Sequence, residues 1–536
     1  MYNFSLQNFR IFNEKTSFEL NNINVLVGKN NSGKTTLSHG LKLYLNNINN
    51  LSLRDMPSRF MACLPIFKFS DSLNSSTHIG TFIRALNNNS PSNSIVFSLT
   101  NNNLTVQTTV SRFSRHFTEK DGKMTDHSHN SIAPITKIEF VDNEYDVYLE
   151  FDFLSQTSHV IYNYLGNGNC FKKWRKQIES LRGRIERGKR ANKVRINPID
   201  INSIQNEMNF IQKAIDFGIS TRFDFKSRLI TDPEPQEPFD NNFYTSLVQR
   251  TGAAISLTNP ENDKFIEINA LCFEYSRKQV EKLAPYVVLI CNGIIEKLHS
   301  YLPKDIYTVD THYLKRSVVY DLSDKNDYLA QIIRDYLNVR IKEDDEEKVF
   351  IEKWMDRFEI GEDFKIENFG GECFKLEIID DVDKPKESIP LLDKGVGSYH
   401  IMTILLKLAT IMKKHKYEII PPIIIIEEPE QNLHPKLQSL LADLLLEVSM
   451  SPKQHNKDSN GFIFIIETHS EYFVRKSQVI VKNMLKHDKS NQPFAVYYLE
   501  KGALPRLMKY QENGTFSNYF GEGFYDEAIS LAEQIL

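Results

Sequence analysis

A glycine-rich loop followed by a lysine and a threonine is the first stretch of this sequence whose spacing could do chemistry. Residues 28–36, GKNNSGKTT, match the pattern G-x-x-x-x-G-K-[ST]. In such a loop the backbone N–H groups face an anion, Lys34 adds a positive charge, and the Thr35 hydroxyl can bind Mg²⁺. The pattern therefore predicts a nucleoside triphosphate site, for ATP with Mg²⁺. The predicted binding residues are Gly28, Asn30, Asn31, Ser32, Gly33, Lys34, Thr35 and Thr36.

Two adjacent glutamates are the second candidate for chemistry. Glu427 and Glu428 directly follow four isoleucines, which are preceded by two prolines. Neighbouring side chains of a strand point to opposite sides, so the two carboxylates can take different roles. We expect Glu427 to bind Mg²⁺ and Glu428 to orient and deprotonate an attacking water. The alternative is that both carboxylates merely end a strand and begin a turn.

A histidine stands directly after another apolar segment, in residues 461–474, GFIFIIETHSEYFV. His469 would lie next to a strand end, where its ring could hydrogen-bond a γ-phosphate or the attacking water. A single histidine is more often structural, but the matching strand end favours a functional one here. We therefore predict His469 as a second catalytic residue beside Glu428.

The elements that must position these residues follow from their hydrophobic patterns. Residues 23–27, INVLV, suit a strand that leads into the loop, and residues 36–45 have the apolar spacing of a helix. The isoleucines before Glu427 suit a strand buried on both faces of a parallel sheet. Because ligands of such sheets bind at the carboxyl ends of the strands, the candidate residues are expected at that edge of an α/β fold.

Length and composition exclude several other classes of protein. With 536 residues the chain should form two or three domains, and its apolar content of 41% is typical of globular proteins. The five cysteines include no Cys-x-x-Cys pair, which argues against a zinc site or a disulfide framework and fits a reducing compartment. The N-terminal residues MYNFSLQNFRIF lack the basic, apolar and small-residue pattern of a signal peptide, and the longest apolar run is too short for a membrane span. We therefore expect a cytoplasmic protein without membrane contact.

The three motifs together resemble the ABC-type ATPases of the SMC, RecF and OLD kind. GKNNSGKTT corresponds to Walker A, IIIIEE to Walker B with Glu428 as the catalytic glutamate, and IIETHS to the switch segment with His469. The resemblance implies an α/β fold, a P-loop ATPase head with a mixed sheet flanked by helices, plus a mainly helical insertion. The expected domains are the N-terminal part of the head at 1–165, the insertion at 166–300 and the C-terminal part of the head at 301–536.

The same resemblance assigns residues 393–405, DKGVGSYHIMTIL, to the signature loop, which in this family touches the γ-phosphate bound by a second protomer. The sequence departs from the family pattern, because Tyr399 and His400 stand where many relatives have Ser and Gln. The resemblance implies a homodimer or higher oligomer through the ATPase heads. Gln107 and Gln156 are weak candidates for the glutamine of the family's Q-loop. The residues that would face the partner's nucleotide are Gly395, Gly397 and Ser398.

A strongly basic stretch begins the insertion. Residues 172–195 hold eleven lysines and arginines against two glutamates, in a chain whose net charge is −4. Such a stretch can contact DNA or RNA phosphates, although charge runs usually form a solvated helix face. The insertion is broken by Gly183, Gly188 and Pro198 and lacks a sustained heptad pattern, so no long coiled coil is expected. The candidate nucleic-acid contacts are Lys172, Lys173, Arg175, Arg184, Arg187 and Arg190.

Relatives of the OLD type carry a metal-dependent nuclease domain after the ATPase. Only 67 residues follow His469 here, and they contain no Asp-x-Asp pair. We therefore expect no nuclease active site in this chain. The segments VYYLEKG and YFGEGFYDEAISLAEQIL resemble the C-terminal tail of ATPases from bacterial anti-phage defence operons.

Three alternative functions follow from these resemblances. The first is an ATPase that dimerises around nucleotide and regulates a separately encoded nuclease, as PtuA-like ATPases of Septu systems and Septu-like retrons do with an HNH-type nuclease. In retrons, reverse transcriptase and its RNA–DNA product would be further partners. The second is a DNA repair or recombination ATPase of the RecF or SMC kind that acts directly on DNA. The third is a nucleotide-dependent scaffold with little turnover.

Overall fold

The computed structural model forms two compact units, Met1–Phe18 with Gly40–Leu302 and Glu19–His39 with Pro303–Leu536. The residues that the structure describes are 2–49, 66–69, 79–90, 92–101, 104–111, 118–120, 123–125, 132–143, 147–152, 157–162, 169–194, 202, 204–206, 208–209, 211–212, 223–228, 265–268, 271–274, 301–309, 317–381, 383, 387–418, 420–450, 461–486, 492–521 and 524–535. The predicted domain boundaries at 165 and 300 stay a prediction.

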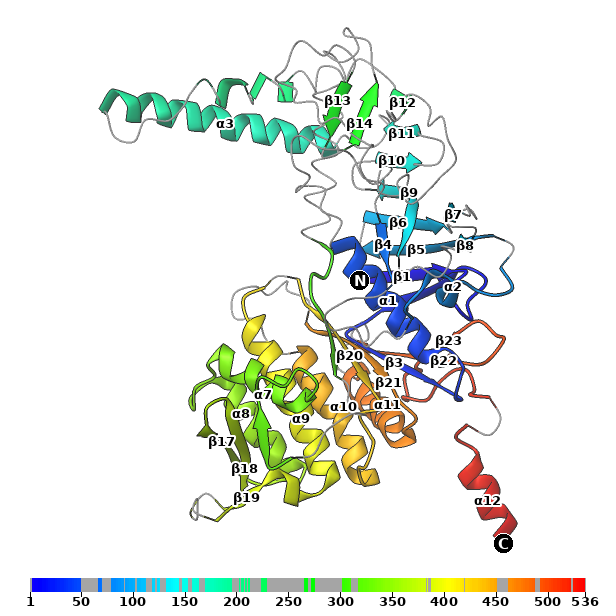
Figure 1. Cartoon of the computed structure of the whole chain (residues 1–536), viewed down its shortest axis with the longest axis vertical. Helices are drawn as coiled ribbons and strands as arrows, with labels where there is room; N and C mark the ends of the chain where they lie inside the picture. Colours follow the sequence, from blue (N-terminus) through cyan, green and yellow to red (C-terminus); the bar gives the residue numbers. More distant parts are fainter. Residues whose placement is uncertain are drawn as a thin grey trace. The chain divides into compact units, whose positions relative to one another are not determined.

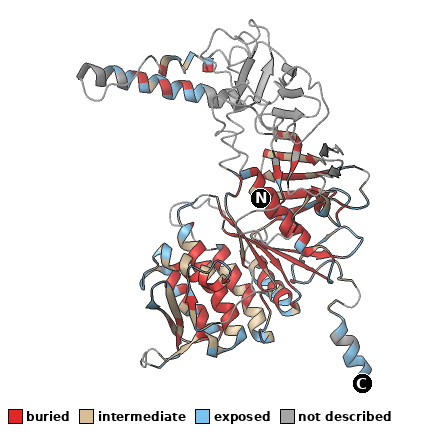
Figure 2. Ribbon diagram, in the orientation of Figure 1, coloured by how far each residue is buried: buried red, intermediate tan, exposed pale blue. Residues whose placement is uncertain are grey.

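The second unit is built on a six-stranded mixed sheet (Figure 1). Its strands, in spatial order, are β15 (Ile306–Val309), β20 (Ile423–Glu427), β21 (Ile463–Glu467), β3 (Ile23–Gly28), β22 (Phe494–Leu499) and β23 (Arg506–Met508). The first five run parallel, and β23 is antiparallel to β22. The central strands are buried along almost their whole length (Figure 2), as expected for parallel strands covered on both faces. The predicted α/β fold is confirmed.

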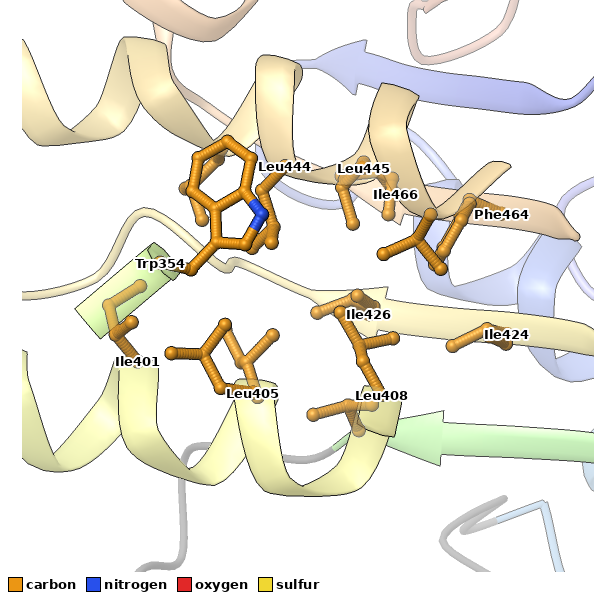
Figure 3. Close-up of a cluster of buried hydrophobic side chains, with 14 of the residues drawn as sticks. Trp354, Ile401, Leu405, Leu408, Ile424, Ile426, Leu444, Leu445, Phe464 and Ile466 are labelled. Carbon is orange, nitrogen blue, oxygen red and sulfur yellow. The ribbon is translucent and has the colours of Figure 1, made fainter. Parts of the chain in front are cut away.

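Helices pack on this sheet through rows of apolar side chains. On α9, Ile401, Leu405 and Leu408 recur at helical spacing and point towards the isoleucines of β20 (Figure 3). Trp354 of α8 is fully buried in the same cluster. Burial of each large side chain of this kind contributes about 1.5–3 kcal/mol, so the cluster holds the strand ends firmly in place. The helices of this unit are α7 (Tyr328–Val339), α8 (Glu346–Arg357), α9 (Val396–Lys414), α10 (Pro435–Met450), α11 (Glu471–Leu485) and α12 (Glu527–Ile535).

A smaller antiparallel sheet of the same unit leads into α9. Its strands are β16 (Val319–Asp321), β17 (Asp363–Gly370), β18 (Cys373–Ile379) and β19 (Ser388–Pro390), with β18 at the centre. After β19 the chain forms the 3₁₀ turn η2 (Leu391–Lys394), and Gly395 then caps the start of α9. The sheet therefore delivers the predicted signature loop to a helix N-terminus.

The first unit contains a nine-stranded sheet with antiparallel pairing. The order is β12-β11-β10-β9-β6-β5-β1-β2, and β4 pairs with β9. The bounds are β1 (Tyr2–Gln7), β2 (Thr16–Leu20), β4 (Ile66–Lys68), β5 (Ser94–Asn101), β6 (Leu104–Ser111), β9 (Ile132–Asp142), β10 (Val147–Asp152), β11 (Thr157–Tyr162) and β12 (Phe223–Arg228). The remaining elements are α1 (Lys34–Asn49), which is shared with the other unit, α2 (Phe82–Ala85), and the hairpins β7 (Thr118–Lys120) with β8 (Lys123–Thr125) and β13 (Phe265–Ile268) with β14 (Leu271–Glu274).

The insertion is mainly helical over its described residues and begins with the 26-residue helix α3 (Asn169–Val194) (Figure 1). Gly183 and Gly188 lie inside this helix, so the prediction that they break it is wrong, while Pro198 lies outside the described residues. A glycine in a helix costs only about 1 kcal/mol relative to alanine. Burial of one face of the helix offsets this, and the buried residues are Ile178, Leu181 and Ile185.

Within the described residues, no helix combines the length and the apolar character that crossing a membrane requires.

Candidate nucleotide-binding site

The loop between β3 and α1 has the backbone that its two glycines predict. Gly28 has a φ of 148° and Gly33 a φ of 101°, a region that side chains disfavour. A Cβ at Gly28 would lie 2.1 Å from the carbonyl oxygen of Leu499 on β22, so the loop can follow this course only with glycine there. Asn31, between them, also has a positive φ of 60°. The loop is therefore shaped by its backbone to wrap around an anion.

Lys34, the first residue of α1, folds back over this loop. Its ammonium group donates hydrogen bonds to the carbonyl oxygens of Gly28 (2.8 Å) and Lys29 (3.1 Å). Burial lowers the pKa of Lys34, while nearby carboxylates, chiefly Glu467, act in the opposite direction. The Ser32 hydroxyl is buried and has no hydrogen-bond partner among the described residues. A buried cation and an unsatisfied hydroxyl in one loop fit the oxygens of a phosphate group.

Thr35 contacts a carboxylate that the sequence analysis did not select. Its hydroxyl donates to Glu467 Oε2 at 2.6 Å, and the Ser38 hydroxyl donates to Glu467 Oε1. Burial, and then the charge of Glu427, raise the pKa of Glu467 to about 7. The signal that could have found it is its place at the end of the second apolar strand, since Glu467 pairs in register with Glu427.

The two adjacent glutamates do have different surroundings, although not through strand alternation. β20 ends at Glu427, whose Oε1 lies 3.4 Å from His39 Nε2. Glu428 follows with a φ of 47°, so the chain turns there, and its N–H donates to the Glu467 carbonyl oxygen at 2.8 Å. Its Oε2 accepts a hydrogen bond from Gln431 Nε2. The turn therefore leaves the Glu427 carboxylate at the end of β20, beside His39, and places the Glu428 carboxylate against Gln431 in the loop that follows.

His469 stands just after β21, and its backbone is tied to another glutamate. Its N–H donates to Glu430 Oε1 at 2.6 Å, and burial raises the pKa of Glu430. Ser470 caps α11 by accepting a hydrogen bond from Phe473 N, so helix capping ends the loop. Burial and the charge of Lys34 lower the pKa of His469, which keeps the exposed ring neutral near neutral pH.

The strand ends beside the phosphate loop present hydroxyl and carboxylate oxygens to a cation. They are the Thr35 hydroxyl, which is hydrogen-bonded to Glu467, and the carboxylate of Glu427, the strand neighbour of Glu467. Hydroxyl and carboxylate oxygens are the ligands that Mg²⁺ prefers. The donor set therefore fits Mg²⁺ beside the phosphate loop.

One of the predicted signature residues, Gly397, lies against the loop that follows Glu428 in the same chain. A Cβ at Gly397 would come within 2.8 Å of the Asn432 carbonyl oxygen, whereas a Cβ at Gly395 would have open space. Tyr399 and His400 are both buried in the core, so the residues that depart from the family pattern serve packing. Gly395 is exposed and has a φ of 91°, and Ser398 is half-buried. A side chain at position 397 would therefore clash with the Asn432 loop of the same protomer, whatever its effect on a partner's nucleotide.

The basic stretch forms one exposed side of α3. Ile178, Leu181 and Ile185 make the opposite, buried side, at helical spacing. Lys172, Lys173 and Arg190 lie within α3, but their side chains are outside the described part of the chain. The exposed basic residues are Arg175, Lys176, Arg182, Arg184, Arg187 and Lys189, with Glu179 and Glu186 among them.

Neither of the two Q-loop candidates can be assigned from the described residues. Gln107 lies on β6 of the other unit, where its side-chain amide donates to Glu139 Oε2 at 2.6 Å across the sheet. Gln156 lies outside the described residues. The Q-loop residue therefore has no assignment.

Comparisons with known proteins assign this chain to a family. A family model described as "AAA ATPase domain" matches residues 1–474, which include the phosphate loop, Glu428 and His469. No curated protein matches the chain. The match confirms the predicted P-loop ATPase head.

Among solved structures, the chain is similar to the SMC head domain from Thermotoga maritima, with a TM-score of 0.32 and 10% identity over 95% of this chain and 98% of that one. It is similar to the Smc head domain with an extended coiled coil from Pyrococcus furiosus, with a TM-score of 0.30 and 10% identity over the whole of both chains. A RecF recombination mediator protein gives a TM-score of 0.23 and 10% identity over 95% and 97%.

Proposed function

The chain belongs to the AAA ATPase domain family, and we propose that it binds ATP with Mg²⁺ and hydrolyses it as an ABC-type ATPase that dimerises around nucleotide. The observation that carries this proposal is that hydrogen bonds link residues at the ends of the three strands β3, β20 and β21. The Glu467 side chain accepts a hydrogen bond from Thr35, and its carbonyl oxygen accepts one from Glu428. The loop after β3, the end of β21 and the end of β20 therefore supply one site.

The phosphate loop supplies the binding of the triphosphate in this proposal. Its backbone N–H groups and Lys34 would hold the β- and γ-phosphates once the ammonium group leaves the loop carbonyls that it now contacts. Thr35 and Glu427 would bind Mg²⁺, which when bound neutralises charge on the phosphate oxygens. The unsatisfied Ser32 hydroxyl would donate to a phosphate oxygen.

Glu428 and His469 supply the chemistry at the γ-phosphate. Glu428 accepts the proton of the attacking water, and the amide of Gln431 holds that carboxylate in place. Burial, and then the charge of Lys34, lower the pKa of His469, and the residue follows the end of β21, so a neutral ring is proposed beside the γ-phosphate. There it can hydrogen-bond a phosphate oxygen or the water.

A dimer would complete the site in this proposal. Gly395, Gly397 and Ser398 surround the N-terminus of α9, and an exposed helix N-terminus is suited to an anion held by another protomer. The wild-type protein is expected to release phosphate from ATP only with Mg²⁺, and to change from 62.3 kDa to twice that mass with a non-hydrolysable ATP analogue. Light scattering and a phosphate-release assay measure both. Phosphate release no faster than without protein would contradict the proposal.

The role of hydrolysis in the cell is proposed from the sequence resemblance alone. We propose that ATP binding regulates a separately encoded HNH-type nuclease in anti-phage defence, as in Septu systems or Septu-like retrons, with reverse transcriptase and its RNA–DNA product as further retron partners. Co-purification from the native operon, with identification of bound protein and nucleic acid, tests this. Recovery of the chain from such a preparation with none of these partners would contradict it.

A second candidate, direct action on DNA as in repair or recombination, is supported by the exposed basic side of α3. Reversing two charges there, with Arg184→Glu and Arg187→Glu together, is expected to weaken binding of a labelled random-sequence duplex. Because phosphate contacts release counterions, the slope of log affinity against log salt should fall by roughly 2. Fluorescence anisotropy over a salt series measures both quantities.

The matched control reverses two exposed lysines in the other unit, Lys501→Glu with Lys509→Glu, and changes the net charge equally. This control should keep the affinity and slope of the wild type. If both double variants have the same affinity and the same salt slope, the basic side of α3 does not bind DNA and is an ordinary solvent-exposed helix face.

A further inference from the structure

Glu467 lies closer to the phosphate loop in the sheet than either of the two adjacent glutamates. β21 lies between β20 and β3, so its last residue ends directly beside the strand that leads into the loop. In register, Glu467 pairs with Leu26 on one side and with Glu427 on the other. A side chain at the end of β21 can therefore reach the first turn of α1, while Glu427 is one strand further away.

The Glu467 carboxylate is held by two hydroxyls from that turn. Thr35 donates to one oxygen at 2.6 Å and Ser38 donates to the other, and Glu467 is only 3% exposed. A hydroxyl has one proton and two acceptor lone pairs. Because the hydroxyl proton of Thr35 points at Glu467, the lone pairs of the same oxygen point away from Glu467. A cation binds to such a lone pair, so this orientation lets the Thr35 hydroxyl serve as a ligand.

The charges around this contact also favour a cation. Glu427 and Glu467 end adjacent strands, and their mutual repulsion is unfavourable at a buried position. Lys34, whose charge acts on Glu467, is directed to the loop carbonyls by two hydrogen bonds. A divalent ion between the strand ends and Thr35 would relieve the repulsion.

We propose that Glu467 is a positioning residue of the Mg²⁺ site, which orients the Thr35 hydroxyl as a ligand and adds negative charge beside Glu427. This inference rests on the proposed function, since it presumes that Mg²⁺ and nucleotide bind at this loop. Glu467 contacts neither water nor phosphate in this role and acts through Thr35. The competing explanation is a purely structural link between α1 and β21.

Metal affinity separates these two explanations. The full-length protein is titrated with Mn²⁺, as a paramagnetic substitute for Mg²⁺, in the presence of a non-hydrolysable ATP analogue, and free Mn²⁺ is followed by electron paramagnetic resonance. For Glu467→Gln we expect the Mn²⁺ affinity to fall roughly 10- to 100-fold, because the uncharged amide neither attracts the ion nor fixes the hydroxyl equally well. Binding of a fluorescent ATP analogue in EDTA should not change.

A second variant protects the test against misfolding. Ser38→Ala keeps the charge of Glu467 and removes one of the two donors that hold it, so a smaller loss of Mn²⁺ affinity is expected. The matched control is Glu347→Gln, which removes a buried carboxylate of α8 that pairs with Lys413 and Lys416. It should leave the Mn²⁺ affinity unchanged.

The outcomes distinguish this inference from the proposed function. If the wild type binds nucleotide and Mn²⁺, and both Glu467→Gln and Ser38→Ala keep the wild-type Mn²⁺ affinity, the role of Glu467 is structural and only this inference is wrong. If the wild type binds no nucleotide with or without metal, both this inference and the proposed function are overturned.

Discussion

Replacing Glu428 with Gln is expected to stop ATP turnover while leaving ATP binding intact. The amide is nearly isosteric with the carboxylate and can keep the hydrogen bond from Gln431, so the loop after β20 should not move. It cannot accept a proton from water, and loss of a general base slows a reaction by roughly 10²- to 10⁴-fold. Steady-state phosphate release should fall by that factor, and ATP-bound dimers should accumulate in light scattering.

The control for this variant is Glu447→Gln. Glu447 lies on the surface of α10, where it pairs with Lys353, so the same change of charge is made away from the strand ends. Normal phosphate release is expected. Should Glu428→Gln also hydrolyse ATP at the wild-type rate, Glu428 is not the general base, and the buried Glu430 becomes the next carboxylate to test.

Replacing Lys34 with Ala is expected to remove most of the affinity for ATP. The Lys34 ammonium group is buried beside the loop and would exchange its hydrogen bonds to the Gly28 and Lys29 carbonyl oxygens for bonds to phosphate oxygens. A hydrogen bond to a charged group contributes about 1.5–3 kcal/mol, which corresponds to a loss of roughly 10- to 100-fold in affinity. Titration with a fluorescent ATP analogue measures this directly.

Lys29 provides a matched control in the same loop. Its side chain is exposed, and only its backbone carbonyl contacts Lys34. Lys29→Ala should therefore keep an affinity close to that of the wild type. Equal losses in the two variants would show that the loop attracts ATP by its net charge and not through a specific contact of Lys34.

The signature loop shows how far a motif can be interpreted without the fold. The spacing and composition of residues 393–405 predict glycines before a helix, and α9 begins between them, at Val396, with Gly397 inside its first turn. The reason for glycine at position 397 could not be predicted, because the group that excludes a side chain is the carbonyl oxygen of Asn432, from a different loop. The departure at Tyr399 and His400 likewise has its reason in the core, where both are buried.

In the basic insertion, burial of one helix face outweighs a local preference of the sequence. Glycines are weak helix formers, and the sequence predicted a break at Gly183 and Gly188. The helix continues through both, because three apolar residues on one face are buried and a propensity difference of about 1 kcal/mol per glycine is small beside that burial.

The sequence by itself determined the phosphate loop, the buried strands and the presence of acids at the strand ends, because each is encoded in a few consecutive residues. The tertiary structure decided which acid meets which hydroxyl. Thr35 and Glu467 are 432 residues apart, and they meet only because β21 lies between β20 and β3. Strand order in a parallel sheet depends on how the connecting helices pack, and no local pattern specifies it.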